Sequence, residues 1–358
     1  MRFLFIVQGE GRGHMTQAIS MRDILVRNGH EVLEVLVGKS RVREIPRFFF
    51  DKIEVPVHTY ESPNFAVSHN NKGIHVYQSI LRNLFRLNVY FKSLAFINRK
   101  IKDLKPDVVI NFYEMLGGFT WMFYRPKVKY ICIGHQFLLL HPGFVFPSGR
   151  HFQIWMLNFL TRLTSFGADK QLALSFVSMP DLRKKKIFVV PPLLRNEVRE
   201  LIPHNGNYIL GYMLNAGYSE EIIRWHKTCP QQEAHFFWDK KDVPEDLEVE
   251  PNLWFHRIND VKFLQYMKDC KGYASTAGFE SICEAMYLRK PVLMVPTAGH
   301  IEQRCNSVDG VRAGAGITSD AFDLDKLIDF IPTFNNADQT FVHWEQQAED
   351  RFLTLLTQ

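Results

Sequence analysis

The amino-acid sequence predicts an α/β protein made of two doubly wound domains. Short apolar runs alternate with helical patterns, and this alternation stops at Pro191-Pro192 and then begins again. The 358 residues are enough for two domains of ordinary size. We expect the domains at 1–192 and 193–342, facing a cleft, with a helix at 343–358 that packs back on the first domain.

The apolar runs of the first half predict the strands of a parallel sheet. Strands buried on both faces show continuous apolar runs instead of alternation. The last such run leads into the proline pair, which we expect to be a stiff connector. Strands are expected at 2–8, 31–37, 107–111, 129–133 and 187–190, and a long amphipathic helix at 74–104.

The second half repeats this organisation. Ser219, with Glu220 and Glu221 behind it, predicts a capped helix start. Ligands of open parallel sheets bind at the carboxyl ends of the strands, so functional residues are expected in the loops there. Strands are expected at 207–214, 233–238, 252–257, 273–275 and 291–296, and an amphipathic helix at 344–357.

The composition favours a soluble, cytoplasmic protein. Its 46% hydrophobic and 23% charged residues are typical of globular chains. No run approaches the ~18 apolar residues of a membrane-spanning helix, and the first apolar run is too short for a signal peptide. The five scattered cysteines predict neither a disulfide framework nor a metal site, which favours a reducing compartment.

The charge is distributed unevenly along the chain. Residues 1–186 hold 27 lysines and arginines against 13 acidic residues, a net of +14, and the remainder carries −9. Residues 62–102 and 115–168 contain no carboxylate, and 137–163 are rich in aromatic residues. We therefore expect the first domain to make peripheral contact with an anionic membrane; the alternative is that these aromatic residues pack the core. The basic run 183–186 is short and precedes a buried strand, so nucleic acid is not an expected partner.

Two motifs suggest chemistry. The first is Gly9-Glu10-Gly11-Arg12-Gly13-His14, between a predicted strand and a predicted helix. A dinucleotide fingerprint would have its third glycine where His14 stands. An imidazole, with an unperturbed pKa of ~6.5, is suited to taking a proton at that point.

The second motif, residues 275–306, reads as strand, glycine turn, helix, strand, loop and helix. Gly278 allows a ligand to approach the backbone, and the helix opening at 279–281 offers N–H groups to a phosphate. Glu284, one turn into that helix, can accept both hydroxyls of a ribose. Glu302 and Gln303 can bind the hydroxyls of a sugar.

This second motif resembles the donor-site signature of GT-B glycosyltransferases, which bind nucleotide sugars with two Rossmann-like domains. It is most similar to the UDP-glycosyltransferases and the peptidoglycan N-acetylglucosaminyltransferases. The glycine-rich opening also resembles that of poorly characterised bacterial and archaeal relatives. The matching residues are Gly278, Ser281, Glu284, Pro291, Pro296, Glu302, Gln303 and Asn306.

The resemblance implies a role for each matching residue. His14 would deprotonate the acceptor hydroxyl, and Glu114, just past a predicted strand, is our candidate for orienting it. His135, which also follows a strand, is a candidate acceptor contact. The expected donor-binding residues are Gly11, Gly13, Ile258, Gly278, Phe279, Ser281, Glu284, Glu302 and Gln303.

The resemblance also favours one mechanism. Retaining enzymes of this fold typically carry a glutamate eight positions before the helix glutamate, and Thr276 stands there. We expect an inverting hexosyltransferase that moves a sugar, most simply UDP-linked, to a lipid- or polysaccharide-linked hydroxyl of the cell envelope, with no metal or cofactor. Asp323-Leu324-Asp325 is read as a helix cap. The alternatives are a sugar-nucleotide 2-epimerase and a non-catalytic nucleotide-sugar-binding relative.

Overall fold

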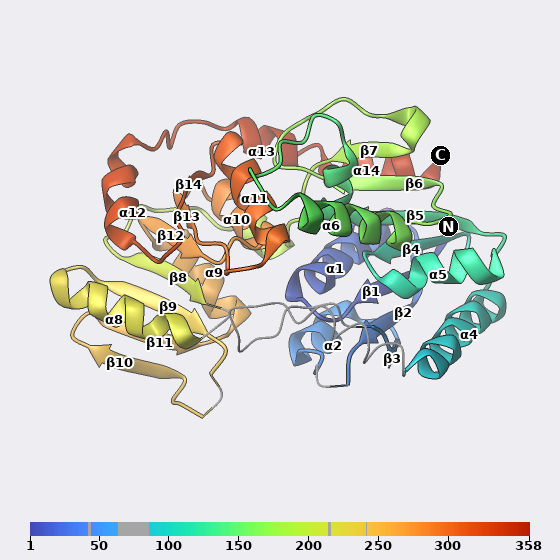
Figure 1. Ribbon diagram of the computed structural model, residues 1–358, viewed down its shortest axis with the longest axis horizontal. Helices are drawn as coiled ribbons and strands as arrows, with labels where there is room; N and C mark the ends of the chain where they lie inside the picture. Colours follow the sequence, from blue (N-terminus) through green and yellow to red (C-terminus); the bar gives the residue numbers. More distant parts are fainter. Residues whose placement is uncertain (42–43, 64–85, 214–215, 241) are drawn as a thin grey trace. The chain divides into compact units, whose positions relative to one another are not determined.

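The computed structural model describes residues 1–41, 44–63, 86–213, 216–240 and 242–358. The chain divides into two compact units (Figure 1). Unit 1 comprises Met1–Phe144, Ser148–Arg195 and Trp344–Gln358, and unit 2 comprises Val145–Pro147 and Asn196–His343. The division after Arg195 falls three residues beyond Pro191-Pro192. Both of these prolines are buried.

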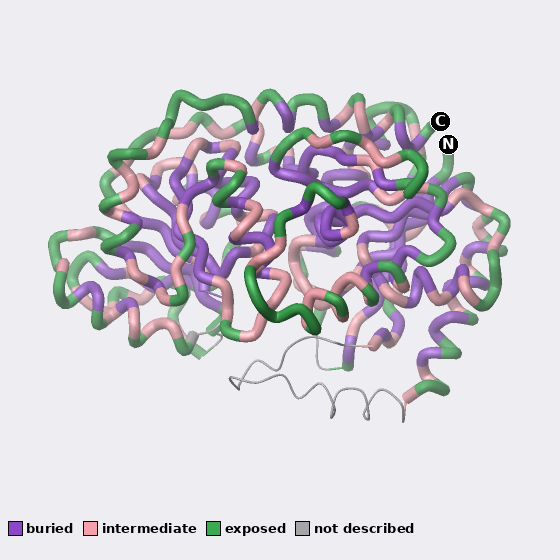
Figure 2. Tube along the Cα trace, turned by 45° about the horizontal axis from the view of Figure 1, so that its top comes forward, coloured by how far each residue is buried: buried purple, intermediate pink, exposed green. Residues whose placement is uncertain are grey.

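Unit 1 is built on a parallel sheet with strand order β3-β2-β1-β4-β5-β6-β7. The central strand β1 is almost wholly buried, as its apolar run predicts, and Figure 2 shows burial concentrated along the strands. β3 and β6 were not predicted, because polar residues interrupt their short apolar runs. The strands are β1 (Arg2–Gln8), β2 (Glu31–Lys39), β3 (Val57–Glu61), β4 (Val108–Phe112), β5 (Lys129–Gly134), β6 (Lys170–Leu174) and β7 (Ile187–Val190).

The helices of unit 1 form two groups. α1 packs against α2, whereas α5 packs between α4 and α6. Right-handed crossovers running outward in both directions from β1 and β4 place such groups on opposite faces of a sheet. The predicted helix 74–104 is observed from residue 87; residues 74–85 lie outside the described part of the chain. The elements are α1 (Arg12–Arg27), α2 (Arg47–Ile53), α4 (Leu87–Leu104), α5 (Met115–Tyr124), η1 (His135–Leu140), α6 (His151–Thr164) and η2 (Arg183–Lys185).

Unit 2 has strand order β10-β11-β9-β8-β12-β13-β14. Only β10 runs antiparallel among its described strands, and its acidic residues keep this edge strand polar. The strands are β8 (Ile209–Met213), β9 (Ala234–Trp238), β10 (Asp246–Glu250), β11 (Leu253–Arg257), β12 (Gly272–Ser275), β13 (Val292–Met294) and β14 (Gly316–Thr318). The helical elements are α7 (Asn196–Arg199), η3 (Ala216–Tyr218), α8 (Ser219–Thr228), α9 (Asp260–Asp269), α10 (Phe279–Tyr287), α11 (Ile301–Arg312), α12 (Leu324–Phe330) and η4 (Ile331–Thr333).

Six strands of each sheet share one order when β1 is matched to β8 and β4 to β12: β3-β2-β1-β4-β5-β6 corresponds to β11-β9-β8-β12-β13-β14, while β7 and β10 have no counterpart among the described strands. In each unit the strand order reverses between this pair, and ligands of doubly wound sheets bind at such switch points. A non-glycine residue with positive φ follows each of β4 and β12: Tyr113 at 56° and Ala277 at 58°. Each is followed by the N-cap residue of a helix, Glu114 for α5 and Gly278 for α10. The backbone is therefore strained at equivalent points of both units.

The C-terminal segment is two helices, which corrects the single helix predicted at 344–357. α13 (Thr340–Glu345) ends where the Trp344 indole N–H donates to the Ser175 carbonyl (3.0 Å), and α14 (Ala348–Thr357) begins after a two-residue turn. Lys129 and Lys170 donate to the Leu356 and Leu355 carbonyls at the end of α14. These bonds satisfy carbonyls that the helix itself leaves free, and they bind α14 to unit 1.

Candidate functional site

The glycine motif joins β1 to α1 through a close approach of two strands. The Gly9 amide donates to the Gly38 carbonyl (2.8 Å), and a Cβ on Gly9 would lie 2.8 Å from the same oxygen. Helix α1 begins at Arg12, two residues earlier than His14, so Gly13 lies in its first turn. Its N-cap, Gly11, provides no side-chain hydrogen bond, and no acidic residue stands in the first turn. The first-turn N–H groups are therefore suited to an anion.

His14 is held by residues that the sequence did not single out. Its side chain is 9% exposed. Nδ1 lies 3.2 Å from Gln17 Oε1, and Nε2 lies 3.5 Å from the amide nitrogen of Gln136. Because an amide oxygen only accepts, Nδ1 carries a proton in this arrangement and Nε2 presents a lone pair, the form a general base needs. The i, i+3 spacing of His14 and Gln17 on a helix is the signal that could have identified this pair.

Tyr113 forms the wall beside the imidazole. Its ring stacks on His14 with centroids 5.6 Å apart, and its hydroxyl hydrogen-bonds Thr161 Oγ1 (2.8 Å). Tyr113 is the residue with φ of 56° directly after β4. Such strain costs ~1–3 kcal/mol and persists where the surroundings impose it, commonly at functional sites.

Glu114 is a buried carboxyl group at the same end of the sheet. It is 2% exposed and accepts hydrogen bonds from Ser62 Oγ (2.5 Å) and the Leu116 N–H (3.2 Å). A Cβ on Gly38 would lie 2.5 Å from its carboxyl carbon, so glycine makes room for it. Burial raises the Glu114 pKa to about 7, against the lowering effect of these hydrogen bonds. These bonds are made to Ser62 and Leu116 and not to His14, so the orienting role of Glu114 stays a prediction.

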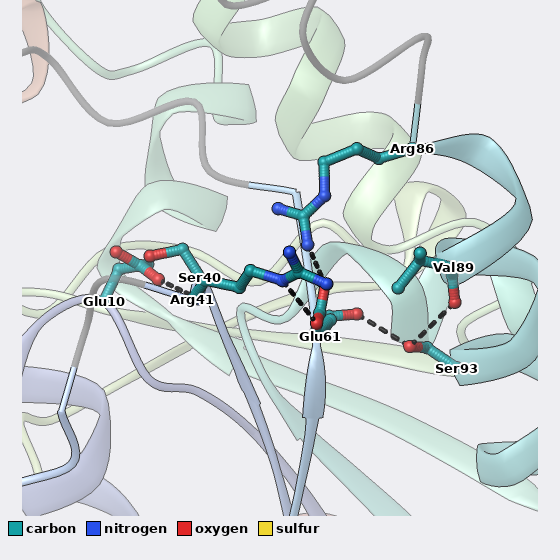
Figure 3. A network of polar contacts seen from close by, with 7 residues as sticks. All are labelled: Glu10, Ser40, Arg41, Glu61, Arg86, Val89 and Ser93. Carbon is teal, nitrogen blue, oxygen red and sulfur yellow. Dashed lines mark hydrogen bonds and ion pairs between the residues drawn. The ribbon is translucent and has the colours of Figure 1, made fainter.

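A second polar network fixes the neighbouring strand ends (Figure 3). Glu10 accepts from the Ser40 N–H (2.6 Å), which ties the glycine motif to the residue after β2. Glu61, at the end of β3, pairs with Arg41 (3.0 Å) and with Arg86. Glu10, the carboxylate of the glycine motif, therefore makes a structural hydrogen bond.

His135, the candidate acceptor contact, is 3% exposed at the start of η1. Its Nδ1 lies 2.8 Å from the Leu174 carbonyl, and its ring packs against Phe144 and Phe176. Burial lowers its pKa to about 4, so the ring is neutral at physiological pH. Its contact with an acceptor stays a prediction.

In unit 2 the turn between β12 and α10 is open. Gly278 is the N-cap of α10 without a side-chain cap, and a Cβ there would meet only Ser281 Oγ, at 3.7 Å. The strained Ala277 before it is held by Asn306, whose amide donates to the Ala277 carbonyl (3.1 Å). The start of α10 therefore has no side-chain cap, and only Ser281 Oγ would lie within 4 Å of a Cβ on Gly278, which suits the approach of a phosphate.

Glu284 and Phe279 are both buried on α10, 4% and 7% exposed. Ser281, between them, donates its hydroxyl to the Gly278 carbonyl (3.2 Å). Glu280 stands in the first turn of the same helix. The predicted ribose carboxylate therefore lies one turn inside the helix whose opening is predicted to bind the diphosphate.

The start of α11 lies beside this turn through Asn306. Gln303 is 6% exposed, and its Oε1 accepts from the Thr297 N–H (2.8 Å). This leaves the NH₂ end of Gln303 to donate to a ligand. His300, not predicted, is the N-cap of α11 and accepts from the Gln303 N–H (3.4 Å), while Glu302 is half-buried.

The remaining predicted residues lie in loops at strand ends. Ile258 is half-buried directly after β11, and Asn259 behind it caps α9 by accepting from Lys262 N–H (3.0 Å). Asp323 caps α12, as predicted, and Asp325 accepts from the Trp225 indole (2.8 Å). These two carboxylates therefore have structural partners. No helix in the described ranges is long and apolar enough to cross a membrane.

The fold and the strand-end residues define a two-domain GT-B glycosyltransferase, and comparisons with known proteins agree. Over residues 1–334 the sequence matches the family described as Glycosyl transferase family 1, and the chain belongs to this family. An uncharacterized glycosyltransferase of Methanosarcina mazei is 23% identical over 334 residues, 86% of this chain and 82% of the relative.

Solved structures share the fold at low sequence identity. Phytolacca americana UGT2, complexed with UDP-2fluoro-glucose and pterostilbene, matches with a TM-score of 0.67 and 10% identity over 100% of both chains. Acinetobacter baumannii MurG matches with a TM-score of 0.56 and 15% identity over 99% of both chains. The GT-B fold inferred from the second motif is thereby confirmed.

Proposed function

We propose that this glycosyltransferase is an inverting enzyme that moves a sugar from a UDP-sugar to a hydroxyl acceptor. The observation that carries the proposal is the β12–α10 turn: a helix start at Gly278 without a side-chain cap, room beside Gly278 for a ligand to approach, and Glu284 buried one turn inside. In this proposal the diphosphate binds the first-turn N–H groups and Glu284 accepts both ribose hydroxyls.

The sugar and the base bind on either side of the diphosphate in this proposal. Gln303 donates its NH₂ group to a sugar hydroxyl, and Glu302 accepts from another. Ile258 packs near the base. A UDP donor is supported by the fold shared with a plant enzyme solved with UDP-2fluoro-glucose.

His14 is the proposed general base. With its Nδ1 proton directed to Gln17, Nε2 takes the acceptor's hydroxyl proton while that oxygen attacks the anomeric carbon. The bond between the anomeric carbon and the diphosphate oxygen breaks in the same displacement, and UDP leaves. Single displacement inverts the anomeric centre. Thr276, buried at the position of the retaining enzymes' second glutamate, offers no carboxylate nucleophile.

The departing negative charge is stabilised by backbone dipoles. The N-terminus of α10 carries a partial positive charge that complements the leaving diphosphate. The first turn of α1, uncapped and without acidic residues, offers a second set of N–H groups through Gly11 and Gly13. This assignment needs neither a metal ion nor a cofactor.

The acceptor in this proposal is a lipid- or polysaccharide-linked hydroxyl of the cell envelope, reached from the cytoplasm. The test is incubation with a panel of labelled UDP-sugars, envelope lipids and polysaccharides, followed by product analysis. We expect free UDP and a labelled conjugate, and His14→Gln should retain donor binding but lose at least about 100-fold in rate, the usual contribution of a general base. A labelled epimer, or binding without turnover, would refute the proposal.

A further inference from the structure

Helix α6 carries a row of three large aromatic side chains in contact with solvent. Phe152, Trp155 and Phe159 are 66%, 56% and 43% exposed. Their spacing of three and four residues places them in one stripe, which we call the α6 stripe. The Phe152 and Trp155 rings stack at 6.0 Å, and those of Trp155 and Phe159 at 5.6 Å. Single exposed apolar residues are ordinary, whereas a continuous exposed row marks an interaction surface.

The charges around the stripe have one sign. α6 begins after the exposed Arg150, and Arg162 stands exposed in its last turn. Residues 115–168, which include α5 and α6, contain no aspartate or glutamate. The stripe therefore complements a negatively charged partner.

Helix α5 extends these properties. It packs between α4 and α6 and ends at Phe123 and Tyr124, which are 58% and 43% exposed. The Phe123 ring meets Phe91 of α4 edge-to-face at 5.8 Å, and Phe91 is itself half exposed. The exposed Arg125 follows directly. Three consecutively packed helices thus carry exposed aromatic side chains beside cations.

We propose that the α6 stripe binds the surface of an anionic phospholipid bilayer. Its rings enter the headgroup region, where tryptophan and phenylalanine are favoured, and Arg150 and Arg162 pair with lipid phosphates. A single-stranded nucleic acid would need ring faces free for its bases, but these rings are stacked on one another. This inference rests on the proposed function, in which the acceptor is linked to a lipid of the membrane. Vesicle binding itself needs no sugar transfer, so the two proposals can be tested separately.

The test is sedimentation of the full chain with vesicles, without nucleotide sugar. We expect binding to vesicles of phosphatidylglycerol and phosphatidylcholine that weakens with salt, and little binding to phosphatidylcholine alone. Phe152→Ser, Trp155→Ser and Phe159→Ser combined should weaken binding at least about tenfold by loss of buried apolar area. Arg150→Gln should weaken it about fivefold at low salt, from ~1 kcal/mol per basic residue.

Matched controls lie on α2, in the other helix group of unit 1. Phe50 is 46% exposed, and Arg47 has a 93% exposed side chain. Phe50→Ser and Arg47→Gln should bind vesicles as the parent chain does, and all variants should retain the parental melting temperature. Trp155→Phe should also bind, but with less quenching of tryptophan fluorescence by brominated lipid.

Three results would overturn the inference. One is vesicle binding that survives the triple stripe variant, and another is no binding of the parent chain to anionic vesicles. The third is a stripe-dependent dimer or RNA complex that forms in place of vesicle binding. A chain that binds vesicles but transfers no sugar would support this inference and refute the proposed function. A chain that transfers sugar but does not bind vesicles would support the proposed function and refute this inference.

Discussion

Replacing Glu114 with glutamine should change how stability depends on pH. The carboxyl group is fully buried, and its pKa rises from 4.5 to about 7. Between these two values the unfolded chain has lost the proton and the folded chain retains it, so the folded chain loses stability as the pH rises through this window. The loss is about 3 kcal/mol, from 1.36 kcal/mol per pKa unit over about 2.5 units.

Glu114→Gln keeps an oxygen that can accept from Ser62 and from the Leu116 N–H, but it cannot ionise. The difference in unfolding free energy between variant and parent should therefore rise by about 3 kcal/mol from pH 4.5 to 7 and remain level above. Urea unfolding at half-unit pH steps measures this difference. Glu31→Gln, at an exposed position on β2, is the control and should show a flat difference. A flat difference for Glu114→Gln itself would refute the reasoning.

Three further predictions concern single residues. Gly9→Ala should destabilise the chain by ~1–3 kcal/mol, because the new Cβ would meet the Gly38 carbonyl. Gly11→Ala is the control and should cost under ~1 kcal/mol, because nothing lies within 4 Å of a Cβ there. Equal losses of unfolding free energy in urea would contradict the close approach at Gly9. Ala277→Gly should stabilise by ~1 kcal/mol by relieving its positive φ, and a loss of stability in thermal unfolding would contradict this. The pKa of His135 is lowered to about 4, so between pH 6.5 and 4 the unfolded chain gains a proton that the folded chain does not, and the unfolding free energy falls. His135→Gln should reduce this fall by up to ~3 kcal/mol. An unchanged dependence of unfolding free energy on pH would contradict the prediction.

The sequence predicted the central strands and the GT-B fold because apolar runs and the residues 278–306 carry strong local signals. The short strands β3 and β6 were not predicted, because pairing with neighbouring strands, and not local composition, makes them strands. The break between α13 and α14 was not predicted for a related reason: Trp344 is held by a hydrogen bond to the Ser175 carbonyl, which is distant in the sequence.

The predicted site residues lie at strand ends and helix openings, but their partners could not be read from the sequence. Glu114 is held by Ser62, 52 positions earlier, and His14 meets Gln136, 122 positions later. Such contacts depend on sheet order. Gln17 was the exception, because helical spacing alone brings it to His14.

Nucleotide binding at the start of α10 is the central claim, and calorimetric titration with UDP measures it directly. Glu284→Gln should weaken UDP binding at least about tenfold, because two hydrogen bonds to a charged group are lost or reduced. Glu280→Gln makes the same chemical change on the same helix and should leave binding equal or tighter, since it removes a negative charge near the diphosphate. Unchanged affinity in the Glu284 variant, or no heat from UDP with the parent chain, would contradict the account.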